Sequence, residues 1–72
     1  MQYVVILVYS TTHALQIEKL LREHGVECKL IPVPRHLSSD CGICVRIWHA
    51  DLELTWALLQ ESGIEYEGCY RL

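Results

Sequence analysis

The sequence contains few positive charges: six Lys and Arg stand against nine Asp and Glu among 72 residues, which gives a formal net charge of −3. No stretch of the chain gathers these positive charges. A protein that binds nucleic acid or an anionic membrane usually carries a concentrated basic patch. We therefore expect neither nucleic acid nor a membrane as a partner.

Long hydrophobic runs are absent as well. The longest, from Tyr3 to Tyr9, is far shorter than the roughly 20 apolar residues that cross a bilayer. A secretory signal typically has a positive charge before its apolar run, and none precedes this one. Four cysteines in a short chain could form a disulfide framework, but such frameworks belong to secreted proteins. We expect a cytoplasmic protein with reduced thiols.

The apolar pattern predicts one domain over residues 1–72, with two helices and four strands. The first run is rich in β-branched and aromatic residues and is too uniformly apolar for an edge strand, so we expect a central strand. Capping residues and glycines mark two helices. The expected segments are strands over 3–9, 26–31, 43–48 and 64–70, and helices from Ser10–Thr12 to Gly25 and from Asp51 to Gly63.

This β-α-β-β-α-β order is the α+β, ferredoxin-like plan: an antiparallel sheet with both helices on one face. Successive side chains of a strand point to opposite faces of the sheet. This alternation predicts that Cys28 is a small core residue and that Cys44 and Cys69 lie on the open face, which the helices do not cover. We expect Trp48 and Trp56 to be packing residues.

The segment between the second and third strands is too long for an ordinary hairpin, whose loop usually takes about two to five residues. Loops longer than that are more often functional. Pro32 and Pro34 stiffen it and present Arg35, and Ser38 and Ser39 add hydroxyl groups.

Cys41 follows these residues and is the candidate reactive group. Gly42 behind it allows a bound group to approach the backbone closely. The thiolate is the reactive form of cysteine, and a nearby guanidinium such as that of Arg35 would favour it, whereas Asp40 would oppose it. The other interpretations, an ordinary loop thiol and a surface ion pair of Arg35, stay open.

Cys41 and Cys44 form a Cys-x-x-Cys pair. A structural zinc site needs a second pair of Cys or His ligands at suitable spacing, which the sequence does not offer, so we expect no metal. A redox pair of the thioredoxin type normally lies where a strand enters a helix, but this pair leads into a strand. Cys44 remains a candidate second thiol.

Several short motifs together resemble the Se/S carrier protein-like family, over essentially the whole chain. They are Tyr9–Leu15, Glu18–Leu21, Ile31–Arg35, Leu37–Gly42 and Gly68–Tyr70. The most specific is Pro32-x-Pro34-Arg35-x-x-Ser38-Ser39-x-Cys41-Gly42. The resemblance implies a reduced bacterial or archaeal cytoplasm and a role in selenium or sulfur handling. The chain lacks the Cys-Pro-x-Pro motif of other carriers, so kinship with those is not implied.

We thus expect a carrier rather than an enzyme, without a cofactor, which holds a persulfide or perselenide on Cys41. Arg35 would stabilise the terminal anion, Ser38 and Ser39 would donate hydrogen bonds, and Gly42 would leave room. Its partners would be donor and acceptor proteins, and homo-oligomerisation is left open. The alternative is a small regulatory or protein-interaction module whose loop binds an anion.

Overall fold

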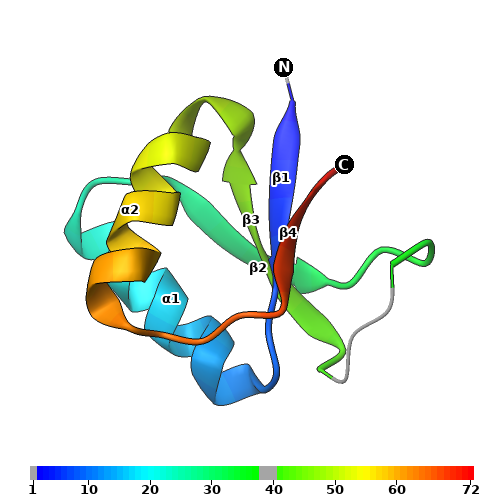
Figure 1. Cartoon of the computed structure of the whole chain (residues 1–72). Coiled ribbons are helices and arrows are strands. Elements are labelled where there is room, and N and C mark those ends of the chain that lie inside the picture. Colours follow the sequence, from blue (N-terminus) through cyan, green and yellow to red (C-terminus); the bar gives the residue numbers. More distant parts are fainter. Residues whose placement is uncertain (1, 38–40) are drawn as a thin grey trace.

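The computed structural model describes residues 2–37 and 41–72 (Figure 1). In chain order its elements are β1 (Tyr3–Leu7), α1 (Thr11–Glu23), β2 (Cys28–Pro32), β3 (Ile43–Trp48), the 3₁₀ helix η1 (His49–Asp51), α2 (Leu52–Ser62) and β4 (Gly68–Arg71). The predicted order is confirmed, and the bounds of β3 match the prediction. The last strand begins at Gly68 instead of Ile64.

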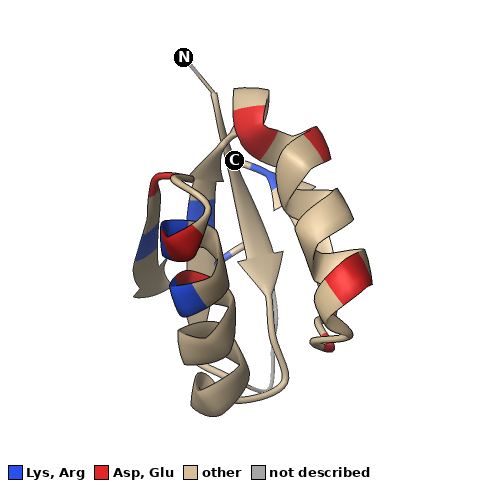
Figure 2. Ribbon diagram, turned by 90° about the vertical axis from the view of Figure 1, so that its left-hand side faces the viewer, with Lys and Arg blue, Asp and Glu red and all other residues tan. Residues whose placement is uncertain are grey.

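The four strands form one sheet in the order β2-β3-β1-β4, and every neighbouring pair is antiparallel. Both helices lie on the same face of this sheet (Figures 1 and 2). The predicted ferredoxin-like α+β fold and the central position of β1 are therefore confirmed.

From Val4 to Val8, which is β1 without Tyr3 and with the residue that follows the strand, each residue is at most 3% exposed. Val4, Ile6 and Val8 belong to the helix-side core, which also contains residues of both helices: Ala14, Ile17, Leu21, Leu58 and Leu59. Val5 and Leu7 point to the other face and form a second, smaller core with Cys44, Ile31, Val33 and Leu37. The β2–β3 connection thus supplies apolar cover to the face that lacks helices, which explains the uniformly apolar run.

The position predicted for Cys69 is wrong. Cys69 is opposite Ile6 in the β1–β4 register and packs against the helix-side core, while Cys44 packs on the other face. Tyr66 also packs against the helix-side core. Because β4 starts only at Gly68, the two-residue alternation counted from Ile64 does not continue into the strand.

Trp56 is not a packing residue, as its side chain is 55% exposed. The buried residues of α2 are Thr55, Leu58 and Leu59. Trp56 is rotated about 100° from Thr55 around the helix axis, away from this buried stripe. The sequence pattern had wrongly included Trp56 in the buried face of this helix.

The helix ends follow ordinary capping chemistry. The hydroxyl of Ser10 accepts a hydrogen bond of 3.3 Å from the backbone N–H of His13 and so caps α1. Gly25 and Gly63 follow the helices with positive φ values of 74° and 73°. The side chain of Asp51, the expected cap of α2, makes no capping hydrogen bond, because η1 leads directly into that helix.

The left-handed backbone at Gly63 generates a prediction with a matched control. A Cβ added at Gly63 or at Gly42 would meet nothing within 4 Å, but only Gly63 has a positive φ. Gly63→Ala should therefore lower the free energy of unfolding by about 1 to 2 kcal/mol, whereas Gly42→Ala should leave it unchanged or slightly raise it. Urea denaturation measures both, and equal effects of the two substitutions would contradict this account.

Candidate functional site

At the start of the connection between β2 and β3, the hydrogen bonds between these two strands continue for one more pair of residues. The N–H of Val33 donates to the carbonyl of Gly42 at 3.1 Å, and a turn follows in which Leu37 N–H donates to the carbonyl of Pro34 at 3.0 Å. Arg35 lies within this turn and is exposed. Of the predicted site residues, Ser38 and Ser39 lie outside the described residues.

Cys41 ends the connection by returning to the helix-side core. Cys41 is only 7% exposed, so the candidate reactive thiol is a buried residue. Its Sγ lies 3.8 Å from the Oγ1 of Thr11, within the range of a hydrogen bond to sulfur. Gly42, next to it, is exposed and has open space where a Cβ would be.

Thr11 is the first residue of α1, so the Cys41 sulfur lies at the amino-terminal end of a 13-residue helix. Aligned peptide dipoles make this end of a helix electropositive, which favours a negative charge placed there. Ser10, the cap, also contacts the ring of His13, with 2.6 Å between Oγ and Nδ1. The sequence marked the Ser-Thr-Thr segment only as a helix start, and nothing in the local pattern indicated that Thr11 would meet Cys41.

Cys44 lies three residues later but on the other face of the sheet. It is fully buried in the second core, and its Sγ is 3.9 Å from the carbonyl oxygen of Pro32, to which it donates. Burial, and to a lesser extent the nearby Cys41, raise the pKa of the Cys44 thiol from 9.0 to about 11. Cys44 is therefore a neutral thiol near pH 7.

Cys28 and Cys69 are partly buried and pack against the helix-side core, which confirms the prediction for Cys28. Burial raises the pKa of both thiols, and Arg22 partly opposes this effect at Cys28. None of the four cysteines forms a disulfide bond. Three of the four are thus held in environments that disfavour the nucleophilic thiolate.

Arg35 forms no hydrogen bond or ion pair with another residue of the ranges 2–37 and 41–72. Its guanidinium is displayed on the exposed turn, and its predicted role beside Cys41 stays a prediction.

The part of the chain that the structure describes contains neither a cluster of metal ligands nor a membrane-spanning helix. Within it, no three His, Cys, Asp or Glu side chains come together as the ligands of a metal ion would. None of its helices has the length and apolar character needed to span a bilayer.

Comparison with protein families matches the chain to the family described as "Putative Se/S carrier protein-like" over residues 3–71. The chain belongs to this family. The match runs from β1 to the end of β4 and includes the segment that carries Cys41, so the resemblance seen in the sequence motifs is confirmed. Comparisons with curated proteins and with solved structures find no match for this Se/S carrier-like chain.

The raised pKa of Cys44 makes the stability of the protein depend on pH. Its thiol ionises near pH 9 in the unfolded chain but near 11 in the folded protein, so the unfolded state loses its proton first. The stabilising contribution is complete below about pH 9 and disappears as the pH rises toward 11.

We expect Cys44→Ala to reduce this alkaline loss of stability by on the order of 1 to 2 kcal/mol. The measurement is urea denaturation between pH 8 and pH 11 on the wild type, on Cys44→Ala and, as a comparison for a less buried thiol, on Cys28→Ala. An identical pH slope in the wild type and in Cys44→Ala would exclude Cys44 as a source of the effect.

Proposed function

We propose that the protein carries a sulfur or selenium atom as a persulfide or perselenide on Cys41 and delivers it to a partner enzyme. The observation that supports this most directly is the contact between the Cys41 thiol and the first residue of α1, 3.8 Å from Sγ to the Thr11 hydroxyl. The segment that makes this contact lies within the match to the Se/S carrier-like family.

The transfer needs no oxidant or reductant. The thiolate of Cys41 attacks the outer sulfur of a donor persulfide, and a new S–S bond forms while the S–S bond of the donor breaks. The electron pair of the broken bond leaves with the inner sulfur of the donor, which becomes a thiolate. A zero-valent sulfur has then moved from one thiolate to another, and a perselenide donor would transfer selenium in the same way.

The surroundings of Cys41 suit each charged stage of this transfer. The attacking thiolate and the resulting persulfide anion both carry negative charge, which the electropositive start of α1 favours. The Thr11 hydroxyl can donate a hydrogen bond to either form. The contact with Thr11 at the start of α1 would direct the incoming atom to Cys41, and the raised pKa values of Cys28, Cys44 and Cys69 disfavour attack by those thiols near pH 7.

The remaining loop residues have supporting roles in this proposal. Arg35 would turn toward the terminal atom once a donor or acceptor docks, Ser38 and Ser39 would donate hydrogen bonds, and the open space at Gly42 would accommodate the added atom.

Such a protein is a substrate for other enzymes more than an enzyme itself, and its partners are a donor and an acceptor protein. A labile persulfide and reduced thiols suit the cytoplasm.

The assignment of Cys41 is tested by intact-mass spectrometry of the reduced protein after incubation with glutathione persulfide. The wild type should gain one sulfur atom, and Cys41→Ser should gain none. Cys44→Ala should behave as the wild type, since a thiol with a pKa of about 11 takes no part near neutral pH.

Circular dichroism of each variant verifies that the fold is retained. A sulfur adduct that persists in Cys41→Ser would reject the carrier site. No adduct on the wild type would favour a protein-interaction module with a loop that binds an anion.

The role of Arg35 is tested separately from that of Cys41. Arg35→Gln should slow the formation of the adduct about tenfold, which corresponds to the loss of one charge-assisted hydrogen bond. Arg71→Gln removes the same charge from a residue that hydrogen-bonds to His49, so it is a matched control. Equal rates for the two variants would remove Arg35 from the proposal and leave Cys41 in it.

A further inference from the structure

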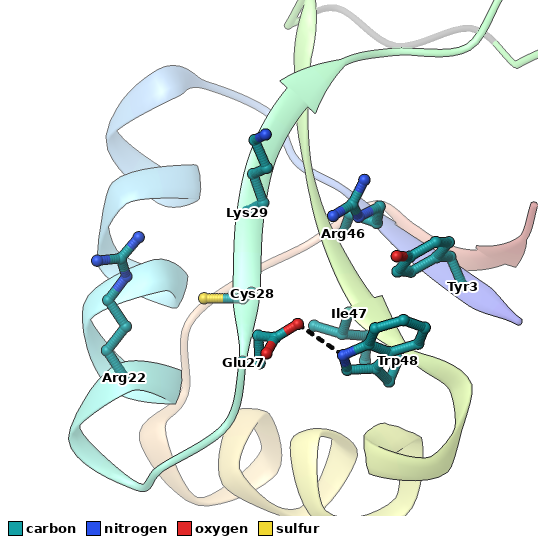
Figure 3. A pocket seen from close by; sticks show the side chains of 8 residues that line it. All are labelled: Tyr3, Arg22, Glu27, Cys28, Lys29, Arg46, Ile47 and Trp48. Atoms are coloured by element: carbon teal, nitrogen blue, oxygen red, sulfur yellow. Dashed lines mark hydrogen bonds between the residues drawn. The ribbon is translucent and has the colours of Figure 1, made fainter. Parts of the chain in front are cut away.

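A groove of about 340 Å³ lies at the end of the sheet where β1 and β2 begin and β3 ends (Figure 3). The lining residues that matter for its chemistry are Tyr3, Arg22, Glu27, Lys29, Arg46 and Trp48. Its volume is within the range of small-molecule sites, roughly 300 to 1,000 Å³. Cys41 belongs to the other end of β1, so this groove is separate from the proposed carrier site.

Folding concentrates positive charge in this groove. Arg22, Lys29 and Arg46 are three of the six Lys and Arg of the chain, and they come from α1, β2 and β3. Helix α2, in contrast, carries only acidic charges (Figure 2). Folding thus brings together cations that are distant in the sequence.

Two of these three cations have no anionic partner in the part of the chain that the structure describes. Arg22 forms an ion pair of 3.1 Å with Glu18, but Lys29 and Arg46 form none with another described residue. They are directly opposite each other in the β2–β3 register. Like charges opposed across a ladder destabilise a sheet, and a bound anion would relieve that repulsion.

The guanidinium of Arg46 is held in place by an aromatic stack. It lies 4.1 Å from the centroid of the Tyr3 ring, and the ring of Trp48 stacks on Tyr3 at 4.3 Å. Two groups this close to one ring must occupy its opposite faces, so Tyr3 is sandwiched between them. Trp48 is fixed in turn because its Nε1 donates to Glu27 Oε2 at 2.7 Å.

This stack leaves the edge of the guanidinium available to a ligand. A guanidinium stacked on a ring still presents its N–H groups in its own plane, where they can bind an oxyanion in bidentate fashion. Figure 3 shows the heads of Arg46 and Lys29 at the end of the groove away from the hydrogen-bonded Glu27 carboxylate. An anion bound there would avoid the one acidic group that lines the groove.

We propose that Lys29 and Arg46 bind a phosphate dianion, either free or as the phosphate group of a small phosphorylated molecule. Two cations match the charge of a phosphate monoester, about −1.5 to −2 at pH 7, better than the single charge of a carboxylate. The site goes beyond the carrier function and does not depend on it.

The test is a ¹H–¹⁵N NMR titration of the full chain at pH 7 with inorganic phosphate and, separately, with adenosine monophosphate. Acetate and chloride at matched ionic strength are the comparison anions. Phosphate should shift the amide signals of Lys29 and Arg46 and bind more tightly than acetate. Similar affinities for the two would show that the site recognises the phosphate group alone, weaker binding of the nucleotide would identify free phosphate as the ligand, and tighter binding of the nucleotide would identify a phosphorylated small molecule.

The matched variants are Lys29→Gln and Lys19→Gln, which remove the same charge from the groove and from the exposed surface of α1. Lys29→Gln should weaken phosphate binding about tenfold, and Lys19→Gln should leave it unchanged. Arg46→Lys, which keeps the charge but not the planar fork, should also weaken it. Equal affinities of the two glutamine variants, acetate binding as tight as phosphate, or no shifts at Lys29 and Arg46 would overturn the proposal.

Discussion

The burial of β1 on both of its faces is the constraint on which the rest of this structure depends. From Val4 to Val8 almost nothing of the strand is exposed, so each face needs its own apolar cover. The two helices cover one face, and side chains of the β2–β3 connection cover part of the other. The long connection is therefore a structural element as well as the bearer of the candidate thiol: Val33 and Leu37 anchor it to the sheet, and Cys41 anchors it to the helix-side core.

The Cys41 thiol and the Arg46 guanidinium lie at opposite ends of β1. At the carboxyl end of β1 the chain turns into α1, whose first residue meets the Cys41 sulfur. At the amino end, Tyr3 is stacked between Trp48 and the guanidinium of Arg46. Because the same rigid strand leads to both ends, the geometry of each is determined by the sheet and not by the loops alone.

The four cysteines lie in different surroundings. Cys28, Cys44 and Cys69 differ in position but share a pKa raised by burial. Cys44 differs from Cys41 in the face of the sheet on which it packs, since one belongs to the helix-side core and the other to the second core. A Cys-x-x-Cys spacing in sequence therefore does not place the two side chains on one face of the sheet here.

The sequence predicts the order of the elements, the central place of β1, the glycine ends of both helices and the family, because these depend on local patterns of hydrophobicity, on backbone conformation and on motifs. It misjudged the faces of Cys69 and Trp56, since alternation and helical phase hold only within the true bounds of an element. It does not predict that Thr11 contacts Cys41 or that Lys29 and Arg46 lie opposite each other. Those contacts come from the packing of the whole chain, since they join residues distant in the sequence and no local pattern specifies them.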